Sequence, residues 1–124
     1  MRRLAVTLAT LSLLACAGTA SGGGAPPQIP RIPGAAWFHV ELNVTIRNTP
    51  HTLIVDRGKI TQITTTQVTL HERDGSIVQI PLTDQTIVTV DRAPATISSL
   101  RRRMTATTLR VDGGAAVRVR ATSF

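Results

Sequence analysis

From Trp37 to the C-terminus, apolar and polar side chains alternate with a period of two, which is the pattern of β-strands that have one buried face. The clearest run covers residues 38–46. Strand-like sequence resumes at residues 53–55 and again at residues 59–63. Gly58 lies between these two segments, where a glycine commonly marks a bulge or a sharp bend.

A hairpin is predicted at the centre of this region. Residues 68–70 and 78–82 alternate on either side of Asp74-Gly75, two residue types that tolerate the positive φ angles of a type I′ turn. Pro81 has no backbone N–H, so the second strand is expected to end there or to lie at a sheet edge. Residues 104–111 and the strand that follows Asp-Gly-Gly at 112–114 predict a second tight hairpin.

Two shorter elements complete the pattern: a strand at residues 86–90, and a single helical turn at residues 94–100 with Thr96 near its cap. A chain of 124 residues forms one domain. Six to seven short strands and one helical turn within residues 37–124 predict an all-β fold, a small antiparallel barrel or sandwich.

Residues 1–15 have the features of an export signal. Met1 is followed by Arg2 and Arg3, and residues 4–15 form an apolar stretch. That stretch is shorter than the roughly 20 residues that a membrane-spanning helix needs. We therefore expect the protein to leave the cytoplasm.

The only cysteine of the sequence, Cys16, follows this signal directly. Residues 13–16 (Leu-Leu-Ala-Cys) resemble the bacterial lipobox, whose cysteine receives diacylglycerol and becomes the new N-terminus. Residues 15–17 and 18–20 also fit the small-x-small pattern of ordinary signal peptidase, so a secreted or periplasmic protein without an anchor is the alternative. Residues 16–36 are rich in glycine and proline, and such a linker beside an acylation site favours the form that is lipid-anchored to the cell membrane.

Four segments have a shared pattern of glycine, leucine and turn residues: GKITQI at 58–63, VTLHERDGSIVQIPL at 68–82, TIVTVDRAPATISSL at 86–100 and RRRM at 101–104. They resemble a family of bacterial exported domains of unknown function, with the pattern Gly-x-Ile, Leu-x-x-x-Asp-Gly, Val-x-Val-x-Gly and Leu-Arg-x-Gly-Met. The resemblance covers roughly residue 53 to the C-terminus and implies a small β-barrel and no reaction. Arg92 or a neighbour, and Arg103, stand where the pattern has glycine.

Charge adds a candidate class of ligand. The formal net charge is +7, and without Arg2 and Arg3 of the export signal there remain 12 basic and 7 acidic residues, a net charge of +5. Eleven of those 12 basic residues are arginine. A basic surface favours phosphates, anionic lipids and acidic polymers, although a solvated charged face is the commoner role of arginine.

The C-terminal hairpin places four arginines as candidate anion-binding residues. In the predicted pairing, the residue numbers of two partners add up to an odd number. Odd-numbered residues of one strand therefore share a face with even-numbered residues of the other. The inward set is Met104, Ala106 and Thr108 opposite Val117, Val119 and Ala121. The outward set is Arg103, Arg118 and Arg120, with Arg101 close by. Guanidinium groups bind phosphate in a bidentate fork, which suits envelope lipids or acidic polymers.

Little else in the sequence predicts chemistry. His39 and Glu41 share a strand face and His51 and His71 lie near loop or strand positions, but a zinc site needs three or four converging ligands, so no metal is expected. Neither a nucleophile elbow nor a phosphate-binding turn is present, so no enzyme and no cofactor is expected. Three aromatic residues are too few for a nucleic-acid barrel, which binds bases by stacking.

The sequence therefore favours an exported, lipid-anchored envelope module with a binding or structural role. Its expected partners are the membrane, through the lipid anchor, and anionic envelope polymers or lipids. One alternative is a secreted β-barrel that binds anions or nucleic acid, and a second is a metal-binding or enzymatic domain.

Overall fold

The computed structural model describes residues 26–124. The all-β prediction is confirmed, because eight strands of this part form a single sheet and its helical content is one 3₁₀ turn. The elements are β2 (His39–Ile46), β3 (Thr49–Ile63), β4 (Gln67–Glu72), β5 (Ile77–Pro81), β6 (Ile87–Val90), β7 (Ala93–Ala95), η1 (Ile97–Ser99), β8 (Thr105–Val111) and β9 (Ala116–Thr122).

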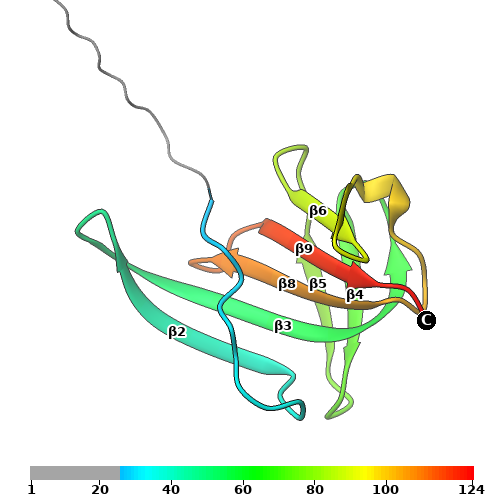
Figure 1. The fold of residues 1–124 in the computed structure, drawn as a ribbon, viewed down its shortest axis with the longest axis horizontal. Helices are drawn as coiled ribbons and strands as arrows, with labels where there is room; N and C mark the ends of the chain where they lie inside the picture. Colours follow the sequence, from blue (N-terminus) through cyan, green and yellow to red (C-terminus); the bar gives the residue numbers. More distant parts are fainter. Residues whose placement is uncertain (1–25) are drawn as a thin grey trace, which may run out of the picture.

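The sheet is strongly curved and remains open (Figure 1). Its strand order is β5-β4-β3-β8-β9-β6-β7, with β2 as a further partner of β3, so β5 and β7 lie at the ends of the order. The neighbours pair antiparallel except β6 and β9, which are parallel. The architecture is thus a mixed, barrel-like sheet that does not close.

The two segments predicted on either side of Gly58 form one strand of 15 residues, β3. Along one edge of β3, β2 pairs as far as Asp56 and β4 pairs from Gly58 onward, while β8 occupies the other edge. A Cβ atom on Gly58 would lie 2.6 Å from the backbone oxygen of His71 in β4. Glycine is therefore needed for the close approach of β4, and the bulge itself lies between Ile60 and Gln62.

The central hairpin forms where predicted, but its turn is not of type I′. Only Gly75 has a positive φ, 92°, and its N–H bonds the carbonyl oxygen of Glu72 at 3.0 Å. The Asp74 carboxylate accepts bonds from the backbone N–H and the hydroxyl of Ser76, and the φ of Asp74 itself is not positive. The result is a three-residue loop with glycine in the left-handed position. Type I′ geometry occurs instead at Asp112-Gly113, where both φ angles are positive.

Proline and threonine mark element ends as expected. Strand β5 ends at Pro81 and lies at a sheet edge, and η1 begins directly after Thr96. The helical turn predicted at residues 94–100 is shorter than expected, because Pro94 and Ala95 belong instead to a strand, β7. Strand β7 pairs only with β6, through a tight turn in which Asp91 and Arg92 both have positive φ.

Apolar side chains pack on both faces of the sheet. The larger cluster fills the inside of the curve, and as predicted it contains Ala106, Val119 and Ala121. Val117 packs with the second cluster, on the opposite face. The prediction for Val117 is wrong because a register shift after Leu109 pairs Arg110 with Ala116, and Ala116 takes the inner position.

The second cluster is covered by the chain before β2. Ile29, Ile32 and Trp37 pack against Leu53, Val55 and Leu109, and this segment crosses β8, β3 and β2 in Figure 1. Arg118 donates hydrogen bonds to the carbonyl oxygens of Pro27 at 2.8 Å and Pro26 at 3.1 Å. The second half of the predicted linker, from Pro26 onward, is therefore seated on the sheet.

Two predictions lie outside residues 26–124: the export signal and the lipidation of Cys16. Within the described part, no helix is long and apolar enough to cross a membrane.

Candidate functional site

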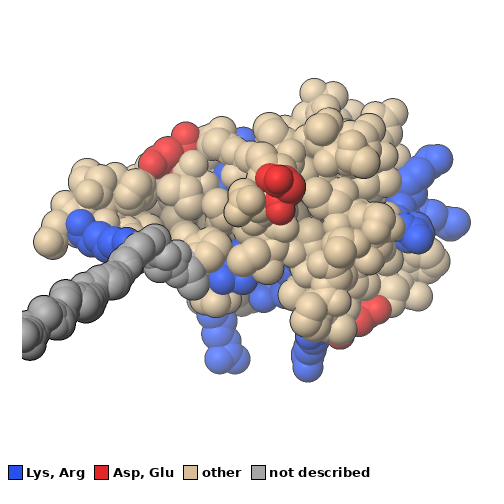
Figure 2. All heavy atoms as spheres, turned by 90° about the horizontal axis from the view of Figure 1, so that it is seen from above, with Lys and Arg blue, Asp and Glu red and all other residues tan. Residues whose placement is uncertain are grey.

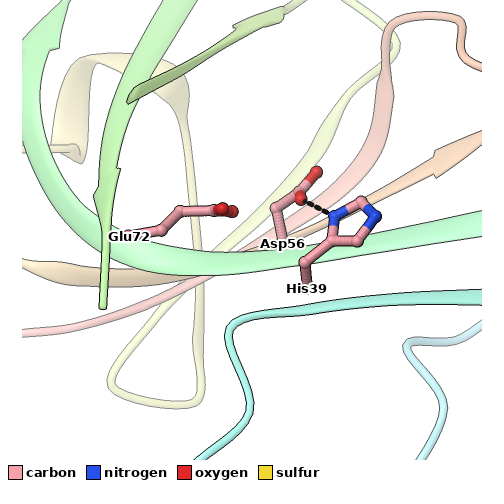
Figure 3. Close-up of side chains that lie close together, drawn as sticks. All are labelled: His39, Asp56 and Glu72. Carbon is pink, nitrogen blue, oxygen red and sulfur yellow. Dashed lines mark hydrogen bonds and ion pairs between the residues drawn. The ribbon is translucent and has the colours of Figure 1, made fainter. Parts of the chain in front are cut away.

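Three ionisable side chains meet where β2 and β4 abut along the same edge of β3. His39, the first residue of β2, is the register partner of Asp56 in β3. Glu72, the last residue of β4, is the partner of Gly58, two positions further on and thus on the same face as Asp56. Figure 3 shows the Glu72 carboxylate directed toward Asp56, with the His39 ring on the other side of Asp56.

Asp56 is the centre of this group. It is 1% exposed, and its two carboxylate oxygens have different partners. Oδ1 lies 2.5 Å from Nδ1 of His39, and Oδ2 lies 3.3 Å from Nη2 of Arg110 in β8. The other ring nitrogen of His39 lies 3.5 Å from Oε2 of Glu41, on the solvent side. The hydrogen bond to Asp56, followed by its charge, raises the pKa of His39 above 6.5.

Glu72 is buried without a compensating cation of its own. It is 5% exposed, and its Oε2 atom has no hydrogen-bond partner. Burial, and next the adjacent Asp56 carboxylate, raise the pKa of Glu72 to about 7. A carboxyl group in this position is costly to ionise, since its charge has lost water and faces a like charge.

Unpaired buried polar atoms concentrate in this region. In the described part of the chain, three buried side-chain atoms make no hydrogen bond: Glu72 Oε2, Thr108 Oγ1 and Arg110 Nε. Thr108 is the register partner of Asp56 on β8, and Arg110 is its ion-pair partner. Buried polar groups are normally paired, so several unpaired ones at one place are where an ordered water or a polar ligand would bind.

Donor atoms of His39, Asp56 and Glu72 lie within 4.8 Å of one another. One imidazole and two carboxylates are a donor set that divalent first-row metal ions accept. Chemically, this group of residues can hold a proton between carboxylates or bind a cation.

A second histidine–aspartate pair provides a comparison. Nδ1 of His51 lies 2.6 Å from Oδ2 of Asp112, and the two side chains are 27% and 53% exposed. The backbone N–H of Thr52, and next His51, lower the pKa of Asp112. This pair joins the end of the β2–β3 hairpin to the β8–β9 turn, and among residues 26–124 the only group with three clustered metal-ligating side chains is that of His39.

The four candidate anion-binding arginines have separate environments. The guanidinium of Arg118 bonds Pro26 and Pro27, and that of Arg101 bonds the carbonyl oxygens of Ser98 and Leu100. Arg103 lies over the ring of Phe124, 5.8 Å from its centroid, and Arg120 is exposed. On the face seen in Figure 2, basic side chains lie in several separate groups. Anion binding by these residues stays a prediction.

The histidine pattern noted in the sequence contributes only part of the site. His39 and Glu41 do form an ion pair, whereas His71 is exposed and alternates to the opposite face from Glu72. Sequence reasoning missed Asp56 and Glu72. A signal for Glu72 was present, because it continues the inward series of Val68 and Leu70 at a spacing of two.

Comparison with known proteins gives no relative. No family model matches the sequence, and neither the curated proteins nor the solved structures include a match.

Proposed function

We propose that this protein is an exported module that a lipid on Cys16 anchors to the cell membrane, with its β-sheet domain held close to the bilayer. The observation that carries the proposal is the sequence Leu13-Leu14-Ala15-Cys16 at the end of a short apolar stretch with a basic start. Two acyl chains on one cysteine supply the two anchoring signals that stable attachment needs.

The seating of the segment before β2 supports a short tether. Ile29, Ile32 and Trp37 pack on the sheet, and Arg118 bonds the carbonyl oxygens of Pro26 and Pro27. About ten peptide units therefore separate Cys16 from the domain, which at full extension span at most about 35 Å. A domain at that distance stays near the lipid headgroups, where a net positive charge is favourable for anionic lipids.

The test replaces Cys16 with Ala and follows the protein in fractionated cells. The parent should enter the membrane fraction, take up a labelled fatty acid and yield a mature N-terminus at Cys16. Cys16→Ala should lose the label and move to the soluble exported fraction. Ser12→Ala, a change of similar size in the same stretch, serves as the control. An unlabelled parent with a mature N-terminus at Gly18 or Ser21 would contradict the proposal and support simple secretion.

Anionic headgroups are the ligand class that the proposal assigns to the exposed arginines. Arg103 and Arg120 are exposed, whereas Arg118 would first have to release two carbonyl groups. Binding of Cys16→Ser protein to anionic vesicles should weaken with salt and with the double change Arg103→Ser and Arg120→Ser. Equal binding to zwitterionic vesicles, or no loss in the double variant, would leave these arginines without a role in binding.

A further inference from the structure

We propose that His39, Asp56 and Glu72 bind one divalent first-row transition-metal ion, for which Zn²⁺ is the best fit. The three side chains come from β2, β3 and β4, and their donor atoms lie within 4.8 Å of one another. The inference does not depend on the lipid anchor, since all three residues belong to the described domain. It concerns a site that lies on the inner face of the sheet, at the junction of two strands (Figure 3).

The donor set and its spacing fit a metal ion with little adjustment. Zinc–nitrogen and zinc–oxygen bonds of about 2.0–2.2 Å place two ligands of a tetrahedral ion about 3.4 Å apart. In the structure, Nδ1 of His39 and Oδ1 of Asp56 are 2.5 Å apart, and the whole set spans no more than 4.8 Å. Shifts of roughly 1 Å in the positions of the donor atoms would bring all three around one ion. The ion would take the place of the proton between His39 and Asp56.

Independent support comes from the buried atoms that lack partners. Oε2 of Glu72 is buried, unpaired and part of a carboxylate that points toward Asp56. Oγ1 of Thr108 is likewise unpaired, on a fully buried residue opposite Asp56 in the register. A bound ion would satisfy Glu72 directly, and a water on that ion would give Thr108 a hydrogen-bond partner.

The surroundings of His39 are those of a metal-binding histidine. Its second ring nitrogen faces Glu41, and a carboxylate in that position fixes the ring and makes the other nitrogen a better ligand. The His39 side chain is 40% exposed, so the ion can enter from solvent on this side. With three protein ligands, the fourth position is left for water or for a ligand from solution.

Arg110 sets the strength of the site. Its guanidinium binds Oδ2 of Asp56, the oxygen that does not face His39, and so leaves Oδ1 for the ion. The positive charge of Arg110 nevertheless repels a metal ion, because both would bind the same buried carboxylate, that of Asp56. Arg110→Gln should therefore bind the metal more tightly than the parent, although the change removes a buried ion pair. Damage to the fold would have the opposite effect on affinity.

The experiment is a calorimetric titration of Zn²⁺ into the full chain, in a Cys16→Ser background that removes the thiol. The parent should bind one ion per chain. Glu72→Gln and His39→Gln should each weaken binding by roughly tenfold or more. The matched controls His51→Gln and His71→Gln, each of which removes another imidazole, should bind as the parent does. Because Cys16 is replaced, the outcome is separate from the test of the anchor.

X-ray absorption at the zinc edge of the loaded parent provides a measurement that does not need a variant. The spectrum should show one imidazole with oxygen ligands for the rest. The proposal is overturned if the parent does not bind one ion, if no imidazole is present, or if Glu72→Gln binds like the parent. Should a ligand variant fail to fold, the spectrum and the direction of the Arg110→Gln effect decide the result.

Discussion

Raising the pH from 5 to 8 should destabilise the metal-free domain, chiefly because of Glu72. Burial and the neighbouring Asp56 raise its pKa from 4.5 to about 7 on folding. Below pH 4.5 both the folded and the unfolded chain carry the proton. As the pH rises from 4.5 to 7, the unfolded chain loses the proton while the folded chain keeps it, so stability falls throughout this interval.

The magnitude follows from that difference in pKa. A change from 4.5 to about 7 corresponds to roughly 3 kcal/mol in total, most of which is lost between pH 5 and pH 8. For a domain of this size, that loss lowers the unfolding temperature by roughly 10–20 °C.

His39 acts in the same direction. Its pKa is raised in the folded state, so the stabilisation that it adds is present below pH 6.5 and is lost as the pH rises through the raised value. Asp74, Asp91 and Asp112 have lowered pKa values and lose their contribution only in acid, below about 3.8. Of the groups with shifted pKa values, only Glu72 and His39 therefore change the free energy of unfolding between pH 5 and pH 8.

The assay is urea unfolding, followed by circular dichroism, at four pH values in the presence of a chelator. The parent should lose roughly 2–3 kcal/mol between pH 5 and pH 8. Glu72→Gln should retain only the smaller decline due to His39, and Asp84→Asn, which removes an exposed carboxylate, should follow the parent. Parallel profiles for the parent and Glu72→Gln, or a parent that becomes more stable toward pH 8, would refute the reasoning.

Three backbone predictions test the fold. Gly58→Ala places a Cβ 2.6 Å from the backbone oxygen of His71, so we expect about 1–3 kcal/mol of destabilisation in thermal unfolding, and an unchanged midpoint would contradict the close approach of β4. Gly75→Val forces a branched residue to a φ of 92° and should cost about 1 kcal/mol or more, although the added Cβ would meet no atom within 4 Å beyond its chain neighbours. A neutral result would mean that the turn is misassigned. Arg103→Gly removes the strain of a non-glycine residue at a φ of 78° and should raise stability by up to about 1 kcal/mol, which a lowered unfolding temperature would disprove.

Local properties of the sequence determined most of the strands. The alternation in residues 38–46 predicts β2 because side chains of a strand point to opposite faces in turn. Pro81 ends β5 and Thr96 precedes η1 for reasons contained in the residues themselves: a missing donor and a short polar side chain. In the C-terminal hairpin, the predicted odd-sum pairing holds from Thr105 to Leu109 and fails at Arg110, next to the turn, where the register shifts.

Only the tertiary structure decided what the strands bring together. Gly58 permits β4 to approach β3 next to the first residue of β2, and this places Glu72 beside Asp56 and His39 although they are far apart in the sequence. Val117 lies on the opposite face from the predicted one for a similar reason, because a register shift between Leu109 and Arg110 cannot be predicted from the local pattern of residues. Alternation fixes which face a side chain takes within its own strand, whereas the neighbours on that face depend on pairing between distant segments. The candidate site consists of such neighbours, so it could not be found from the sequence alone.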